Sequence, residues 1–382
     1  FLQLLCHYRS RDELLIAFSN LYIYEKPMLT FPSVKGLDSD ALRFVHLPTG
    51  NFERDKNAPP HHLVVDGSKV AIPSLRTNRI EAEAVVKLVV ERLRDPRRIK
   101  RRNEDPKGEA ESIIVVTFNI QQLNLITALL QNDAPDDYAR AISETMEDEE
   151  AGTKKTYPQL KIKNLENVQG DQAETVIFSV AFSKKADGSI PLNWGPVTQS
   201  GGDRRLNVAV TRAQVEMVVF CSFEPDEMTK GSGGKKRSIS AEADMVYKFL
   251  SLAKNGANKT GDIGIGVPRS KHIEKIAHEL RQKNYEVQTQ LGLSNLRVDI
   301  AVRRPGESKW TLAIMVDDSC WSERGSAYQR EILPRQVLPS LGWAKVYRLW
   351  MPSWMSEREA ILRDIDDFFE GNIIETEEPV VE

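Results

Sequence analysis

The stretch Gly201-Gly-Asp-Arg-Arg-Leu-Asn-Val-Ala-Val-Thr-Arg-Ala213 is the part of this sequence from which its fold is most readily inferred. Its two glycines are typical of a turn, and the residues after them predict a helix. Arg204 and Arg212 are eight residues apart, about two helical turns, so we expect them to share one face. A fixed guanidinium suits stabilisation of charge on a transferring phosphate. Taken alone, an arginine pair on a helix is more often a solvated or ion-paired face.

Around this stretch, short β-like runs alternate with runs of helical period through about the first 225 residues. This alternation predicts an α/β fold with a parallel sheet. The expected strands are Leu2–Cys6, Arg43–Leu47, Ile113–Thr117, Thr175–Ala181 and Glu216–Ser222. The expected helices include Arg11–Leu21, Arg79–Leu93 and Ile120–Gln131.

A second compact α/β unit is expected after a linker that contains the flexible segment Thr229–Arg237 and one helix, Ala241–Leu252. Its expected order is a helix, three strands, a helix, a strand and a closing helix. These elements are expected at Lys271–Lys283, Tyr285–Gln290, Leu296–Arg303, Trp310–Val316, Tyr328–Leu338, Lys345–Trp350 and Ser356–Phe369.

The composition excludes several classes of protein. Of the 382 residues 41% are hydrophobic and 28% are charged, with a formal net charge of -3, which is typical of a globular protein rather than a polycation. Three cysteines without CxxC spacing argue against a disulfide framework and a cysteine zinc site. No apolar run approaches ~18 residues, so no membrane partner is expected and a cytoplasmic location is the default.

The arginine-bearing stretch resembles motif VI of superfamily 1 helicases of the nonsense-decay (AAA_12) type. Three more segments occur in that family's order and spacing. They are Leu5-Cys-His-Tyr-Arg-Ser10, Val115-Val-Thr-Phe-Asn-Ile-Gln-Gln122 and Asn164-Leu-Glu-Asn-Val-Gln-Gly-Asp171. The resemblance implies that residues 1–228 form the second RecA-like motor domain of a helicase.

The same resemblance assigns expected roles to single residues. Arg9 and Arg212 would be the catalytic cations at the γ-phosphate. The expected ATP-binding residues are Arg9, Gln169, Gly170, Gln172, Arg204 and Arg212, and the expected nucleic-acid contacts are Thr117, Asn119, Gln122 and Asn164. The family commonly has Glu where this chain has Gln172, so altered nucleotide affinity is expected.

A phosphate-binding P-loop, GxxxxGK[ST], is not found in the sequence. The nearest match, Gly233–Lys236, lacks the first Gly and the Ser/Thr, and the acidic run Glu147–Glu150 is more typical of a solvated loop. The chain also begins without Met. We therefore expect it to be part of a longer protein, to bind ATP and Mg²⁺ together with an N-terminal motor domain, and to hydrolyse no ATP alone.

Two of the expected strands, Leu296-Arg-Val-Asp-Ile-Ala-Val302 and Leu312-Ala-Ile-Met-Val-Asp-Asp318, carry acidic residues. With these segments, residues 269–372 resemble a Vsr-type restriction-endonuclease-like domain, preceded by a linker at 229–268 and followed by an acidic tail at 373–382. The resemblance implies metal ligands at Glu274, Asp299 and Asp317, and hence a possible second Mg²⁺. Met315 stands where the family usually has Glu, and a thioether is a poor ligand for a hard cation. A degenerate, DNA-binding nuclease fold is therefore expected.

The sequence thus predicts part of an ATP-dependent helicase or translocase with an appended nuclease-like domain, and a place in DNA processing or phage defence. DNA is the expected partner, and RNA stays open. The basic run Arg92–Arg102 is a further candidate for phosphate contact. Two alternatives remain: a nucleic-acid-binding scaffold with an inactive motor, and an active nuclease loaded by the motor.

Overall fold

The computed structural model describes residues 10–24, 28–36, 39–95, 111–143, 146–148, 153–155, 159–256, 269–294, 296–319 and 326–371. These residues form two compact units. The larger unit takes its described residues from 14–24 and 40–256. The smaller unit takes its described residues from 10–13, 28–36, Ser39 and 269–371.

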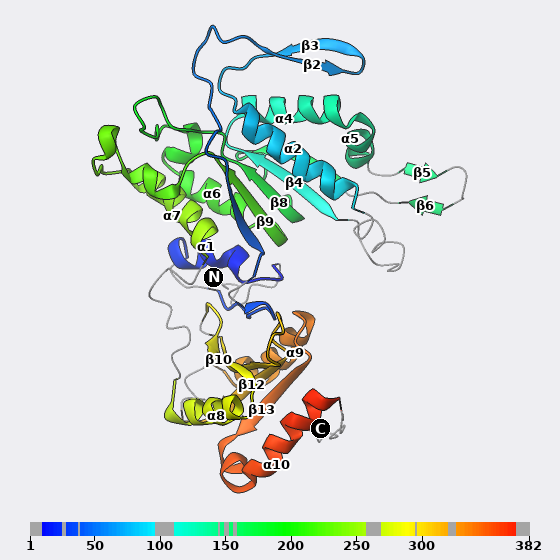
Figure 1. The fold of residues 1–382 in the computed structure, drawn as a ribbon, viewed down its shortest axis with the longest axis vertical. Helices are drawn as coiled ribbons and strands as arrows, with labels where there is room; N and C mark the ends of the chain where they lie inside the picture. The colour runs from blue at the N-terminus through cyan, green and yellow to red at the C-terminus, as the bar shows by residue number, and fades with distance from the viewer. Residues whose placement is uncertain are drawn as a thin grey trace. The chain divides into compact units, whose positions relative to one another are not determined.

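The larger unit is built on a parallel sheet of five strands in the order β1-β9-β8-β4-β7 (Figure 1). In chain order these are β1 (Leu42–His46), β4 (Ser112–Thr117), β7 (Gln159–Asn164), β8 (Ala173–Ser179) and β9 (Ala213–Cys221). The four predicted strands that fall on described residues are confirmed within a few residues; the prediction for Leu2–Cys6 lies outside them. The predicted α/β class with a RecA-like sheet is confirmed.

Helices cover both faces of this sheet. On one face α2 (Arg79–Leu93), α4 (Ile120–Asp133) and α5 (Pro135–Ile142) pack together, and α1 (Leu14–Tyr22), α6 (Gly202–Val210) and α7 (Ala241–Asn255) form the other layer (Figure 1). Because both faces are covered, the central strand β8 is buried along almost its whole length, with the apolar residues Val176, Ile177 and Phe178 at its centre.

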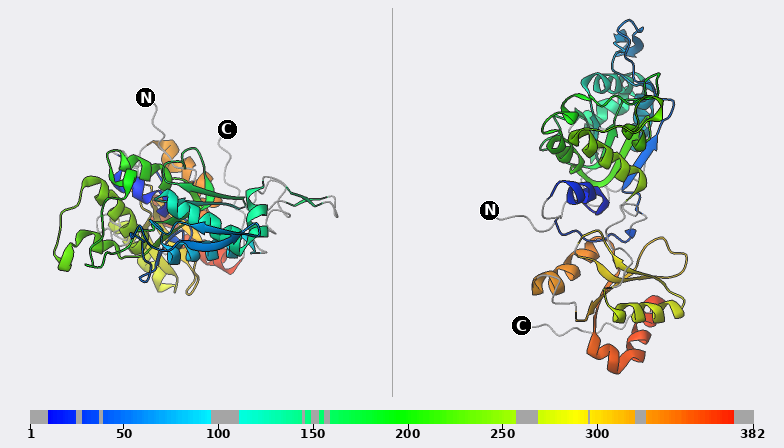
Figure 2. Two further views of the ribbon diagram at one scale, coloured as in Figure 1. Left: turned by 90° about the horizontal axis from the view of Figure 1, so that it is seen from above. Right: turned by 90° about the vertical axis from the view of Figure 1, so that its left-hand side faces the viewer.

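Short elements complete the larger unit. The hairpin of β2 (His61–Val65) and β3 (Ser68–Ile72) projects from it (Figures 1 and 2). A second hairpin pairs β5 (Met146–Asp148) with β6 (Thr153–Lys155). Three 3₁₀ turns follow: η2 (Gly195–Thr198), η3 (Pro225–Thr229) and η4 (Ser232–Gly234).

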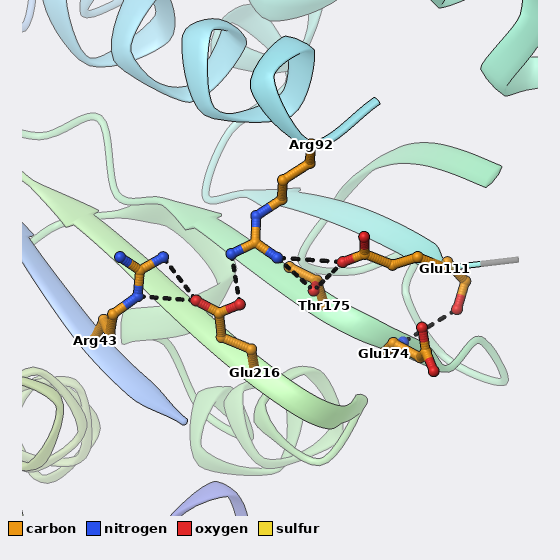
Figure 3. A network of polar contacts seen from close by, with 7 residues as sticks. Arg43, Arg92, Glu111, Glu174, Thr175 and Glu216 are labelled. Atoms are coloured by element: carbon orange, nitrogen blue, oxygen red, sulfur yellow. Dashed lines mark hydrogen bonds and ion pairs between the residues drawn. The ribbon is translucent and has the colours of Figure 1, made fainter. Parts of the chain in front are cut away.

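A buried ion network connects the strands near their amino ends (Figure 3). Arg92, at the end of α2, donates to Glu111 at 3.2 Å and to the Thr175 hydroxyl at 3.0 Å, and it also pairs with Glu216. Arg43 of β1 donates to the same Glu216 at 2.8 Å. Removing one partner from such a network is costly because it leaves a buried charge uncompensated. Because this network occupies the amino ends of the strands, we look for a ligand-binding site at their carboxyl ends.

The smaller unit has a four-stranded mixed sheet in the order β10-β11-β12-β13. Its strands are β10 (Glu286–Leu291), β11 (Val298–Arg303), β12 (Leu312–Asp317) and β13 (Lys345–Trp350), with only the last pair parallel. Helices α8 (Lys271–Gln282) and α10 (Met351–Glu370) share one core with this sheet, while α9 (Leu333–Ser340) contributes to a second core. A π-helical turn, η7 (Tyr328–Ile332), precedes α9.

Residues 28–36 form part of the smaller unit, although 1–228 was the expected motor domain. Phe31 is buried with Trp310, Met315 and Trp343. The Trp310 amide donates to the Val34 carbonyl at 2.7 Å, and the indole of Trp343 donates to the Pro32 carbonyl at 2.9 Å. We call residues 28–36 the strap, because this segment packs against a unit that lies mostly more than 230 positions later.

Candidate functional site

The arginine-bearing helix begins at a glycine pair that the local geometry requires. Gly201 has φ of +76°, and a Cβ on Gly202 would lie 2.0 Å from the Val197 carbonyl oxygen. Helix α6 ends at Val210, so Arg212 lies beyond it. The expectation that Arg204 and Arg212 share a helical face is therefore wrong.

Three hydrogen bonds orient the Arg212 guanidinium. Its Nε donates to the Val208 carbonyl at 2.6 Å, Nη1 to the Asp171 carbonyl at 3.0 Å, and Nη2 to the Thr211 hydroxyl at 3.2 Å. The bond to Asp171 joins two segments that lie 41 positions apart in the sequence. The structure thus brings Arg212 against the turn that carries Gln169, Gly170 and Gln172.

That turn connects β7 to β8. Gln169, Gly170 and Gln172 are exposed on it, and Gly170 has φ of +88°, which a glycine adopts without strain. The Asp171 carboxylate pairs with Lys161 at 2.7 Å and Lys163 at 2.9 Å. The hydrogen bond from Lys161 is the main cause that lowers the pKa of Asp171 below its usual range. Arg204 is exposed on α6, and Arg9 lies outside the described residues.

The expected nucleic-acid contacts divide into buried and accessible side chains. Thr117 is buried at the end of β4 and donates to the Asn119 carbonyl at 2.8 Å. Gln122 is fully buried: its amide oxygen accepts from the Asn78 amide at 2.7 Å, and its amide nitrogen donates to the Asn78 carbonyl at 3.0 Å. Gln122 therefore fixes the start of α2 instead of facing a strand, which corrects the expectation of direct contact.

Asn119 and Asn164 line a pocket with a volume of about 430 Å³ in the larger unit. The pocket lies where β4, β7 and β8 end, and the carboxyl edge of a parallel sheet is the usual ligand position in such folds. Asn119 caps α4 by accepting from the Gln122 amide at 2.8 Å, and Asn164 accepts from the Asn167 amide at 3.0 Å. Besides these two, the lining includes Phe52, Arg76, Phe118, Ile120, Gln121, Leu165, Glu166, Phe182, Asn193, Trp194, Gly195, Pro196 and Val197.

Four aromatic residues, Phe52, Phe118, Phe182 and Trp194, are part of the pocket lining, and no sequence pattern had singled them out. Phe182 stacks on Trp194 with ring centroids 4.9 Å apart and planes 8° apart, and Phe52 lies 4.7 Å from Phe182. Phe118 lies 6.1 Å from Trp194. Phe118 follows β4 directly and Phe182 follows the end of β8 by three residues, which was the available signal.

The three expected metal ligands of the smaller unit do not form a cluster. Glu274 lies on the exposed side of α8 and pairs with Arg281 at 3.1 Å. Asp299 is fully buried and accepts from the Gln290 amide at 2.9 Å and the Val316 amide at 2.8 Å. Asp317 pairs with Arg348 at 2.6 Å.

The residues present therefore do not fit a Mg²⁺ site. Within the described ranges no group of three His, Cys, Asp or Glu side chains could hold a metal ion. The expected trio of Glu274, Asp299 and Asp317 is wrong as a cluster, because the buried face of α8 consists of apolar residues and turns Glu274 outward. Met315, a residue of β12, is buried in the core that also contains Phe31 and Trp343.

No helix in the described part of the chain is long and apolar enough to cross a bilayer.

Comparison with known proteins gives two family matches. Residues 1–224 match AAA_12, described as an AAA domain, and residues 273–369 match REase_MTES_1575, a restriction-endonuclease-like family. An uncharacterized ATP-dependent helicase of Mycoplasma genitalium, MG140, is 29% identical over 258 residues, which are 66% of this chain and 19% of that protein. Its Mycoplasma pneumoniae homologue is 27% identical over 284 residues, 73% of this chain and 21% of that protein. The chain thus spans about a fifth of the length of these curated relatives.

Proposed function

This chain belongs to the AAA_12 family of AAA domains, and we propose that it supplies the second motor domain of an ATP-dependent helicase or translocase. The observation that carries the proposal is the fixing of Arg212 on the Asp171 carbonyl. The P-loop and the carboxylates that hold Mg²⁺ are proposed to lie on a first motor domain of the complete protein. A place in DNA processing or phage defence is part of the same proposal.

Arg212 is proposed to stabilise charge that develops on the γ-phosphate of ATP. A cation that is already oriented stabilises such charge without reorganising during the reaction. Its hydrogen bonds to Val208, Asp171 and Thr211 supply that orientation. Gln169 and Gln172, exposed on the adjoining turn, are proposed to bind the nucleotide, and Arg9 is proposed as a second cation.

The pocket at the carboxyl edge is proposed to bind a single nucleic-acid strand. Amide side chains and a cation suit contacts with phosphate and sugar that do not depend on base sequence. Asn119, Asn164 and Arg76 supply these groups in the pocket lining. DNA is the proposed substrate, and RNA is an outcome of the test.

Fluorescence anisotropy with labelled single-stranded DNA, single-stranded RNA and duplex DNA tests the strand site on this 382-residue chain. We expect preference for a single strand and a salt dependence that becomes shallower by about one unit of log-log slope in Arg76→Ala. Arg79→Ala is the control, because Arg79 is exposed on α2, pairs with Glu83 and does not line the pocket. Equal behaviour of the two variants, or preference for duplex, would contradict the strand site.

The smaller unit is proposed to hold DNA without cutting it. Arg348 neutralises Asp317, and two amides occupy Asp299, so neither carboxylate is arranged for a hard cation. Incubation of the whole chain with single-stranded and duplex DNA plus Mg²⁺ or Mn²⁺ should give no cleavage. Cleavage that disappears in both Asp299→Ala and Asp317→Ala would show an active nuclease instead.

A further inference from the structure

Ala181, two residues beyond β8, adopts a backbone conformation that side chains rarely accept. Its φ is +68°, and the residue is fully buried. A Cβ makes the left-handed conformation unfavourable, so such a residue persists only where its surroundings hold it. The next residue, Phe182, lines the pocket and stacks on Trp194. The unusual turn at Ala181 thus directs the chain into the pocket wall.

Two side chains from the start of α2 hold Ala181 on both sides. The backbone amide of Ala181 donates to Glu81 Oε1 at 2.6 Å, and the side-chain Nδ2 of Asn78 donates to the Ala181 carbonyl at 2.8 Å. Glu81 also accepts from the hydroxyls of Ser179 at 2.7 Å and Ser222 at 3.0 Å. The carboxyl group of one helix therefore ties together the ends of β8 and β9.

Asn78 is also connected to a second residue of the pocket lining, and we call Asn78 and Glu81 together the clamp. Asn78 exchanges two hydrogen bonds with Gln122 through its backbone. The backbone N–H of Gln122 in turn donates to the side chain of Asn119, which lines the pocket. Asn78 and Glu81 are therefore hydrogen-bonded to the residue before Phe182, and Asn78 is connected through Gln122 to Asn119. Neither Asn78 nor Glu81 lines the pocket itself.

We propose that Glu81 and Asn78 are positioning residues of the strand pocket: they hold Ala181 in its left-handed conformation, which places Phe182, and Asn78 places Asn119 through Gln122. This inference rests on the proposed strand-binding function. Both residues act through their neighbours and touch no nucleic acid.

Stability alone is a poor reason for a carboxyl group at this position. Glu81 is fully buried with no basic partner among its hydrogen bonds, and burial raises its pKa to about 7. Removing a carboxylate from water is expensive, and an apolar side chain commonly serves a core better. The group that an apolar residue cannot replace here is the acceptor for the Ala181 amide.

The test compares three variants of the whole chain by thermal unfolding and by affinity for single-stranded DNA. Glu81→Ala removes the acceptor. The double variant Glu81→Ala with Ala181→Gly still lacks it, but glycine adopts the left-handed conformation without strain. Glu111→Ala is the matched control, a buried carboxylate that holds Arg92 at the opposite edge of the sheet.

We expect Glu81→Ala to bind the strand at least about 10-fold more weakly, because the Ala181 amide loses its buried acceptor and the turn that places Phe182 is no longer held. The double variant should recover most of that affinity while its unfolding temperature stays low. Glu111→Ala should lower the unfolding temperature and keep its affinity. Wild-type affinity in Glu81→Ala, or affinities that merely follow the unfolding temperatures of all three variants, would overturn the proposal.

If the wild-type chain binds no single strand, the proposed strand site is refuted. Hydrogen exchange then tests separately whether Glu81 and Asn78 hold Ala181. The amides of residues 180–183 should exchange faster in Glu81→Ala than in wild type. Those of β4, which does not depend on Glu81 for its backbone pairing, should not change. Unchanged exchange at residues 180–183 would overturn the clamp as well.

Discussion

Glu81 is surrounded by hydroxyl and amide donors and has no exposed surface. Its burial raises its pKa to about 7 against an ordinary value of 4.5, and its hydrogen bonds only partly oppose this rise. The neighbouring Cys221 thiol is buried too, and burial raises its pKa, with the charge of Glu81 as the next cause. Glu81 is therefore the group of this cluster that titrates near neutral pH.

This titration predicts how the stability of the larger unit depends on pH. The folded state holds its proton more tightly than the unfolded state, so the contribution of Glu81 is fully present below about pH 4.5. It is lost as pH rises to about 7, by an amount on the order of 3 kcal/mol. Calorimetric unfolding of Glu81→Gln should show a smaller loss of stability between pH 5 and 8 than wild type.

Glu13 of the smaller unit, whose pKa burial also raises to about 7, keeps its own pH dependence in that variant. An unchanged pH dependence in Glu81→Gln would show that Glu81 is already ionised in the folded protein.

The residues of the strand site could be predicted only in part, because a sequence pattern does not show which side chains of a motif are buried. Thr117 and Gln122 belong to a segment that resembles a strand-binding motif, yet both are buried. Asn119, between them in sequence, reaches the pocket because it caps α4 from an extended conformation. The pattern identified the right loop, and the start of the helix decided which side chains face the pocket.

At the scale of elements, strands with continuous apolar runs were predictable and an edge strand was not. β8 and β9 lie inside the sheet, and each contains a buried apolar run, at residues 176–178 and 217–221. β7, Gln159–Asn164, alternates Lys with apolar residues because it lies at the edge of the sheet and, among the described strands, pairs with β4 alone. Its alternation was too short to stand out beside the preceding acidic segment.

The strap is the element whose partners the sequence could not indicate. It lies between two segments that resemble helicase motifs, and its long-range hydrogen bonds include partners at residues 294, 310 and 343. Ser294 bonds both the amide and the carbonyl of Thr30, at 3.1 and 2.8 Å. Such pairing between distant segments follows from packing and leaves no periodic signal.

Phe31→Ala should destabilise the smaller unit by about 3–5 kcal/mol, because it removes a large buried ring from that core. Hydrogen exchange should become faster in β12 and stay unchanged in β4 of the larger unit. Equal protection of β12 in variant and wild type would show that the strap contributes little to this unit.

For the whole molecule, the order of segments along the chain differs from their grouping in space. The expected α/β motor sheet and the following restriction-endonuclease-like sheet are both present. Residues 28–36, however, pack with the smaller unit. The order of motifs along the chain shows which segments belong to the AAA domain. It does not show that residues 28–36, which lie between two such motifs, pack into the core of the smaller unit.

The most direct test is ATP hydrolysis by the complete protein, stimulated by single-stranded DNA. Arg212→Lys keeps the charge but loses the planar guanidinium, so the rate should fall by roughly 10³-fold or more. Arg205→Lys is the control, since Arg205 donates only to the carbonyls of Pro196 and Ser200 among its described hydrogen bonds and should change the rate little. A near-normal rate in Arg212→Lys, or an equal loss in both folded variants, would contradict the assignment of Arg212 to the ATP site.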